Sequence, residues 1–373
     1  MIPDYFFCPV PSCPAHDLTI SHPGWYVRAG FHMTKAFGRV QRYQCKTCGK
    51  TFSDQTFLLN YWLKKSTDFQ ALGREINSSA SSNFIARHHH FSADSMRIRH
   101  DRLARNALFL QSILTRDAPI TEALVADGLE SFVSSQFFPI NLNILIGKQS
   151  QFVYYFTESH SRRKGRITAK QQSMLERMYA GKSFAGSKIS TMFGQLLEFI
   201  AERHADSRVA LHTDEHPVYR SEISKWNKRS DTPVKIDHHR TSSQEPRTTQ
   251  NALFAVNYFD RLIRKDIPNH RRETICYGRN DRNLLSRLVY YVVTHNFHKP
   301  FRISSKAKQT ELTHAEEAMG SIEQMQLWKR RFHECRFFRS FTELPKYFDD
   351  VWFRRTPTPL KVRKDPVPAF AYQ

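Results

Sequence analysis

Two aspartates follow short apolar runs of the length expected for buried β-strands. Asp127 stands in Leu-Val-Ala-Asp127-Gly-Leu, and Asp214 stands in Ala-Leu-His-Thr-Asp214. If these strands are neighbours and parallel, both carboxylates emerge at the same carboxyl edge of the sheet. Phosphoryl transfer by a pair of Mg²⁺ or Mn²⁺ ions requires carboxylate oxygens that converge from separate elements. The two aspartates therefore predict a two-metal catalytic site.

A third acidic ligand is expected from the helix that follows the last strand. Asp260 lies near the start of a predicted helix over residues 255–265, and Arg264 follows one turn later. Glu273 lies beyond this helix and is the alternative ligand. We favour Asp260, because a ligand early in the helix can face the strand ends. Arg264 is a candidate DNA-binding residue at the same site.

Four of the six cysteines form two close pairs near the N-terminus. Cys8 and Cys13 enclose four residues, whereas Cys45 and Cys48 enclose two and are followed by Gly49. Two such pairs can close a tetrahedral site around Zn²⁺, and four thiolates leave no position for a reactive water. The predicted zinc is therefore structural. Disulfides or free thiols are the alternatives, and disulfides are disfavoured because no secretory signal is seen.

The elements that must position these residues are indicated by hydrophobic periodicity. Short apolar runs predict strands over residues 123–127, 141–147, 152–157, 208–213 and 234–238. Longer patterns predict helices over residues 169–181, 190–203, 219–228, 255–265 and 281–297. This order predicts an α/β fold with an RNase-H-like mixed sheet.

The stretch before this sheet is basic and rich in helical patterns. We expect helices over residues 57–63, 79–89 and 93–108, the last of them capped by Ser92. Two helices joined by a short turn, the second rich in arginine, indicate a helix-turn-helix. Its candidate DNA contacts are Arg97, Arg99 and Arg102.

The same helices give two further expectations. In the helix over residues 93–108, the candidate buried positions are Met96, Ile98, Leu103 and Leu108. The run His88-His89-His90 is interpreted as an exposed basic face, because consecutive helical residues do not converge on one metal ion.

Charge indicates the class of partner. The 373 residues include 56 Lys and Arg against 35 Asp and Glu, which gives a formal charge of +21. A strongly basic protein favours nucleic acid, because binding releases counterions from the phosphates. An anionic membrane surface is the alternative, although no run reaches the roughly 18 apolar residues of a membrane-spanning helix. The expected setting is the cytoplasm.

The chain is long enough for several domains, and we divide it into four. The predicted units are a zinc ribbon at 1–55, a helix-turn-helix region at 56–116, the RNase-H-like catalytic domain at 117–300, and a C-terminal helical extension with a basic, proline-containing tail at 301–373.

In this order of motifs, residues 5–300 resemble bacterial insertion-sequence transposases with an N-terminal zinc ribbon and an acidic-triad (DDE/DDD) RNase-H-like catalytic domain. The string Arg-Tyr-Gln-Cys45-Lys-Thr-Cys48-Gly-Lys-Thr-Phe-Ser carries much of the likeness. On this resemblance Asp127, Asp214 and Asp260 hold the catalytic metals. Many relatives have Glu as the third acid with Asn one turn later, whereas here Asn257 precedes Asp260.

The resemblance also implies the reaction and its partners. It implies DNA strand cleavage and strand transfer at the element's ends, with structural Zn²⁺ and catalytic Mg²⁺ or Mn²⁺. The partners are double-stranded DNA, as terminal inverted repeats and target, and a second copy of the chain in a homodimeric or larger synaptic complex. The setting is the bacterial cytoplasm, at the nucleoid. The alternatives are a DNA-binding regulator or decayed transposase without catalysis, and a nuclease that cleaves without joining.

Overall fold

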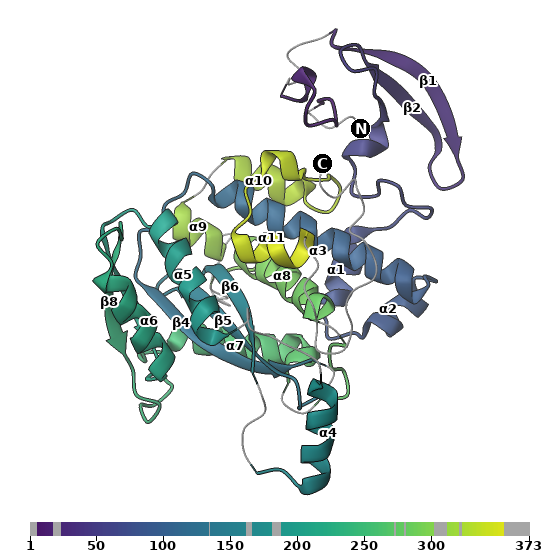
Figure 1. Ribbon diagram of the computed structural model, residues 1–373. Helices are drawn as coiled ribbons and strands as arrows, with labels where there is room; N and C mark the ends of the chain where they lie inside the picture. Colours follow the sequence, from purple (N-terminus) through teal and green to yellow (C-terminus); the bar gives the residue numbers. More distant parts are fainter. Residues whose placement is uncertain are drawn as a thin grey trace, which may run out of the picture.

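The computed structural model describes residues 6–17, 24–133, 135–161, 166–180, 188–271, 274–279, 281–301, 312–320 and 323–353. It has a mixed α/β body and a small antiparallel sheet that projects from it (Figure 1). The small sheet has the order β1-β2-β3 and consists of β1 (Tyr26–Thr34), β2 (Gly38–Cys45) and β3 (Thr51–Ser53).

The body is built on a five-stranded mixed sheet with the order β6-β5-β4-β7-β8. Its strands are β4 (Leu124–Phe132), β5 (Pro139–Gly147), β6 (Val153–His160), β7 (Arg208–Thr213) and β8 (Lys235–Arg240). Antiparallel pairing joins β4, β5 and β6, whereas β7 runs parallel to both β4 and β8. The structure thus confirms the mixed sheet and the five predicted strands.

The predicted helices around this sheet are also present. They are α4 (Ala169–Tyr179), α5 (Ile189–Arg203), α6 (Pro217–Lys228), α7 (Phe254–Asp266) and α8 (Asp281–Phe297). Helix α5 packs against β5 and β6, and α7 packs against β4 and β5. Both helices bury one apolar side, which is the pattern that made them predictable.

The N-terminal helices differ from the prediction in two places. They are α1 (Phe69–Ile76), α2 (Ser82–His88) and α3 (Ala93–Thr115). Ser92 caps α3 as expected, but α1 was not predicted. The expected helix over residues 57–63 is wrong: after the short turn η2 (Asp54–Phe57) the chain is irregular, and Leu58 pairs with Cys335 from the C-terminal part of the chain.

Helix α3 is a core helix and packs along α8. Met96, Leu103 and Leu108 are buried as predicted, whereas Ile98 is 42% exposed and that expectation is wrong. A helix that is buried on most sides serves as a packing scaffold. The expectation that α3 presents an arginine face to solvent is therefore corrected.

The C-terminal segment is helical and belongs to the same body. It contains α9 (His314–Met319), α10 (Glu323–Arg331) and α11 (Lys346–Phe353), and Trp352 of α11 is fully buried. One continuous apolar core contains residues of α1 to α3, the five-stranded sheet and α11. The boundaries proposed after residues 116 and 300 therefore do not separate independent cores. The tail after residue 353 lies outside the described residues.

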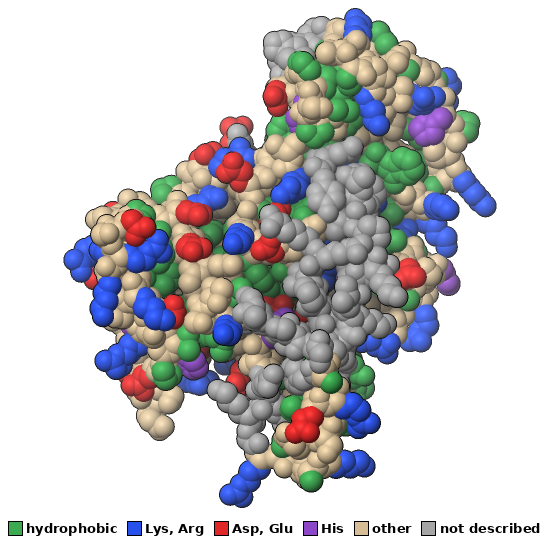
Figure 2. All heavy atoms as spheres, viewed as in Figure 1, with side chains coloured by type: hydrophobic (Ala, Val, Ile, Leu, Met, Phe, Trp, Pro, Cys, Tyr) green, Lys and Arg blue, Asp and Glu red, His purple; other side chains and the backbone are tan. Residues whose placement is uncertain are grey.

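The small sheet rests on the body through aromatic contacts. Phe7 contacts Phe338 and Phe341, with ring centroids 4.8 Å apart in each pair. In the view of Figure 2, Lys and Arg side chains lie over the small sheet and toward the left and right margins of the body. Within the described residues, no helix can cross a bilayer: α3 has the length, at 23 residues, but carries charged side chains along it.

Candidate metal centres

The four N-terminal cysteines converge at one point. Their sulfur atoms all lie within 4.8 Å of one another. The Sγ atoms of Cys8 and Cys48 are 3.5 Å apart, and those of Cys13 and Cys45 are 3.8 Å apart. Tetrahedral zinc with Zn–S bonds of about 2.3 Å requires sulfurs about 3.8 Å apart. All four are free thiols, so the geometry fits a metal site.

Two tight turns bring these thiols together. Gly49 has φ +70°, and its N–H donates to the Cys45 carbonyl at 2.9 Å. This is a left-handed backbone conformation, which glycine adopts without steric cost. On the other side, the N–H of Cys13 donates to the Val10 carbonyl at 3.0 Å. Both pairs are thus held by backbone hydrogen bonds.

The thiols have unequal proton affinities. Burial raises the pKa of Cys8 and of Cys13. Burial also opposes ionisation of Cys45, but the backbone N–H groups of Cys48 and Thr47 outweigh it and lower its pKa to about 7. Because a metal ligand must be a thiolate, Cys45 is expected to lose its proton before Cys8 and Cys13 as Zn²⁺ binds.

Asp127 and Asp214 lie at the same edge of the main sheet. The pairing of β4 with β7 joins Leu124 to Leu211 and Val125 to His212. Asp127 comes two residues after this pairing, and Asp214 directly follows β7. Asp127 does not end its strand as predicted, because β4 continues to Phe132 through its pairing with β5.

The sheet alternation directs Asp127 toward α7. Asn143 and Thr157 lie on the same face of the sheet, because the Asn143 side chain donates to the Thr157 hydroxyl. This face is covered by α5, since the Thr157 hydroxyl donates to the Met192 carbonyl of α5 at 3.1 Å. Gly128 pairs with Asn143 and so belongs to that face. Successive strand residues face opposite sides, so Asp127 faces the other side, where α7 packs on β4.

Electrostatic interactions show that the three aspartates are close. Burial raises the pKa of Asp127 to about 6, and the charge of Asp214 adds to this rise. Burial also raises the pKa of Asp260 well above its usual range, with a further contribution from Asp127. The pKa of Tyr219 on α6 is raised first by burial and then by the negative charges of all three aspartates.

The three carboxylates accept few hydrogen bonds from the described residues. Asp127 Oδ1 accepts the N–H of Gly128 at 2.7 Å, and Asp214 Oδ1 accepts the N–H of His216 at 2.9 Å. Asp260 Oδ1 is buried and has no hydrogen-bond partner among the described residues. Carboxylate oxygens are the ligands that Mg²⁺ or Mn²⁺ prefers, but in this conformation the three acids do not all come within 4.8 Å of one another.

Two arginines act on this acidic cluster. The charges of Arg264 and Arg247 oppose the rise in the pKa of Asp127 and of Asp260. Arg264, predicted from the sequence, lies one turn after Asp260 on α7; Arg247 was not predicted, because it follows β8 in an irregular stretch. The alternative third ligand, Glu273, lies outside the described residues.

Two predicted DNA-binding arginines have structural roles. Arg99 is 2% exposed and donates to the Thr67 hydroxyl at 2.7 Å. Arg102 is 6% exposed and donates to the carbonyls of Leu59, at 2.9 Å, and Tyr61. Both guanidinium groups hold the irregular segment before α1 onto α3, so their assignment as DNA contacts is corrected. Arg97 is half-buried, and its Nε lies 3.6 Å from Asp94.

Two histidine-containing clusters were missed by the sequence analysis. Glu75 Oε1 lies 3.0 Å from both His88 Nδ1 and His89 Nε2. The expectation that these consecutive histidines cannot converge is wrong, because His89 is the residue that ends α2 and not part of its interior. The second cluster consists of Glu158, His160 and Asp281. Asp281 lies far from Glu158 and His160 in the sequence, so no local motif indicates this cluster.

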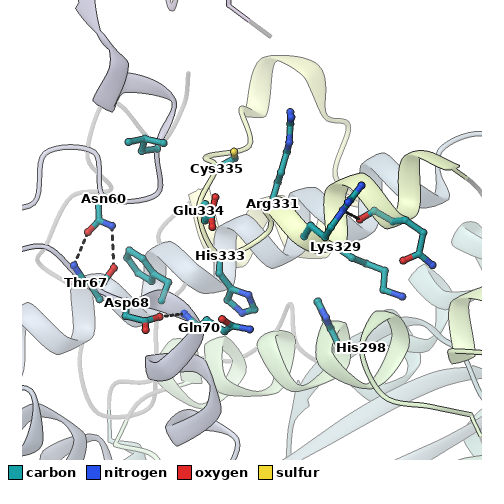
Figure 3. Close-up of a pocket in the computed structure, with 14 residues that line it drawn as sticks. Asn60, Thr67, Asp68, Gln70, His298, Lys329, Arg331, His333, Glu334 and Cys335 are labelled. Carbon is teal, nitrogen blue, oxygen red and sulfur yellow. Dashed lines mark hydrogen bonds between the residues drawn. The ribbon is translucent and has the colours of Figure 1, made fainter. Parts of the chain in front are cut away.

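A basic cleft lies apart from these clusters, between the irregular segment before α1 and helix α10. It has a volume of about 920 Å³. Its charged lining consists of Lys329, Arg330 and Arg331 together with the acidic Asp68 and Glu334, and the side chains of His298 and His333 also border it (Figure 3). Lys329 Nζ also lies 3.9 Å from Glu316 Oε2. Burial lowers the pKa of each of these histidines to about 4. The positive charge of the cleft at neutral pH therefore comes from α10.

A comparison of the sequence with models of the known protein families gives no match, and a comparison with curated proteins gives none either.

Proposed function

We propose that this chain is a transposase that cleaves DNA at the ends of an insertion sequence and joins those ends to target DNA. The observation that carries the proposal is the placement of Asp127 and Asp214 at the same edge of the sheet, with Asp127 on the face covered by α7, the helix that contains Asp260. The five-stranded mixed sheet, with β4 beside a parallel β7, supports an RNase-H-like core.

The three carboxylates would hold two Mg²⁺ or Mn²⁺ ions. When bound, such ions activate the attacking oxygen and stabilise the leaving oxygen at phosphorus. Asp127 and Asp214 are oriented by backbone N–H groups, which fixes the oxygen that each presents. Arg264 and Arg247 would bind phosphate oxygens of the DNA beside the acids, where their charges already act.

DNA binding is supported by charge and by the N-terminal unit. The net charge of +21 favours a polyanion, and the Cys₄ cluster would hold Zn²⁺ to fold a small sheet. Because Arg99 and Arg102 are buried, we propose that DNA contacts the zinc-binding sheet and the basic cleft of α10 instead of the arginine face of α3.

The test uses a supercoiled plasmid that carries the DNA flanking the coding region on both sides. With Mg²⁺ or Mn²⁺, the parent protein is expected to nick this plasmid and to give joined products. Asp127→Asn and Asp214→Asn should each lower the nicking rate by at least about 10³-fold, because each removes a charged ligand. Asp231→Asn is the matched control, since Asp231 forms only an exposed pair with Arg229.

The reaction products distinguish a transposase from a nuclease and from a DNA-binding regulator. Nicking by Asp127→Asn at the parent rate would overturn the metal-site assignment. Nicking without joined products would favour a nuclease, and DNA binding without nicking would favour a regulator.

A further inference from the structure

Three side chains meet at the far edge of the main sheet, where β6 ends and α8 begins. A carboxylate oxygen of Glu158, one of Asp281 and a ring nitrogen of His160 all lie within 4.8 Å of one another. His160 Nε2 is 3.2 Å from Asp281 Oδ2. Glu158 is 5% exposed and Asp281 is 4% exposed, so the cluster is inside the protein.

The carboxylates of this cluster are incompletely satisfied. Tyr347 of α11 donates to Glu158 Oε2 at 3.4 Å. Glu158 Oε1 and Asp281 Oδ1 are both buried without a hydrogen-bond partner in the described part of the chain. A buried polar atom without a partner is unfavourable, and native structures contain few of them.

The cluster contains one imidazole and two buried carboxyl groups. Arg282 follows Asp281 in sequence, but its Nη2 lies 3.4 Å from Asp101 Oδ2 on α3. A divalent cation that displaces the protons of these groups would be bound by both carboxylates and by the imidazole.

We propose that Glu158, His160 and Asp281 form a buried structural site for a divalent transition-metal ion of the Mn²⁺ or Zn²⁺ class. One imidazole and two carboxylates are a donor set that suits these ions. The site would fasten the end of the edge strand β6 to the start of α8. It is separate from the acidic cluster of Asp127, because β5 lies between β6 and β4. It does not depend on the proposed DNA chemistry.

The experiment measures Mn²⁺ binding by electron paramagnetic resonance in the full chain with its Cys₄ site loaded with Zn²⁺. The starting protein carries Asp127→Asn, Asp214→Asn and Asp260→Asn, which remove the acidic residues at the carboxyl edge of the sheet, and Glu75→Gln, which removes a ligand from the cluster of Glu75, His88 and His89. We expect one Mn²⁺ per chain. Adding Glu158→Gln or Asp281→Asn should weaken binding at least about tenfold. Glu202→Gln, an exposed position on α5, is the matched control and should change nothing.

A second measurement keeps the test decisive if a ligand variant folds poorly. In the starting protein, pulsed spectra of the bound Mn²⁺ should show coupling to one imidazole nitrogen, and Mn²⁺ should raise the thermal unfolding midpoint. His160→Gln should abolish the nitrogen coupling.

The proposal is overturned if the starting protein binds no Mn²⁺ at about 1 mM, or if Glu158→Gln and Asp281→Asn bind it as well as their parent. Loss of DNA nicking in the Asp127 variant bears only on the proposed function. Loss of Mn²⁺ from the starting protein bears only on this site, so the two proposals fail separately.

Discussion

Burial and mutual repulsion give Asp127 and Asp260 a property that exposed carboxylates lack. Both have raised pKa values, and for both burial is the larger cause. The charged forms are therefore held in an unfavourable setting that a divalent cation relieves. Arg264 and Arg247 supply part of the compensation, and the unpartnered Asp260 Oδ1 shows that it is incomplete.

Replacement of Cys45 tests whether the four thiols bind zinc. Cys45→Ser removes a thiol whose pKa is lowered to about 7 and leaves a three-thiol site, so stoichiometric zinc should be lost. The small sheet has an aromatic cluster of its own, but this cluster includes three of the four thiols and is much smaller than the core of the body, so the sheet should become labile while the body keeps its core. Zinc content by mass spectrometry and limited proteolysis measure both effects.

Cys276→Ser is the matched control for that experiment, because Cys276 lies outside the cluster. It should retain zinc and the parent proteolysis pattern. Stoichiometric zinc in Cys45→Ser would contradict the Cys₄ assignment.

At the scale of elements, α3 shows how a basic helix can be structural. Arg102→Met should destabilise the protein by about 2 kcal/mol, because the Leu59 and Tyr61 carbonyls lose their donor. Arg97→Met on the same helix should change the free energy of unfolding by less than about 0.5 kcal/mol. Urea unfolding of both variants measures the difference. Equal stability of the two variants, with weaker DNA binding by Arg102→Met, would restore Arg102 as a DNA contact.

The same elements show what local sequence can predict. The strands and helices of the body follow from hydrophobic periodicity, because each buries one face or one stripe in a shared core. Asp214 was placed correctly after β7, since an apolar run and a polar residue mark that strand end. The cysteine cluster was predictable because its spacing is local within each pair.

The errors arise where distant segments decide the outcome. The stretch over residues 57–63 is apolar enough for a helix, but Leu58 pairs with Cys335 and Arg102 binds the carbonyl groups nearby. Asp127 was expected at a strand end, whereas the hairpin with β5 prolongs β4. The cluster of Glu158, His160 and Asp281 depends on an edge strand meeting a helix from another part of the chain.

At the scale of the whole molecule, the N-terminal and C-terminal parts of the chain form one surface. The backbone N–H of Leu59 donates to the Glu334 carbonyl at 2.7 Å, and Phe7 packs on Phe338. The basic cleft borders this junction, and α10 supplies its positive charge (Figure 3). If the proposed function holds, we expect a DNA duplex bound at the small sheet to contact this cleft as well.

The last prediction concerns this cleft. Lys329→Gln combined with Arg330→Gln should weaken binding to duplex DNA and lower the slope of log affinity against log salt by about 2, because each neutralised phosphate contact releases about one counterion. Fluorescence anisotropy over a range of salt concentrations measures both. The control pair, Lys170→Gln with Arg177→Gln, removes two exposed charges from α4, at the opposite end of the body (Figure 1). It should leave the slope nearly unchanged. An equal loss in both pairs would mean that net charge alone, and not the cleft, governs the affinity for DNA.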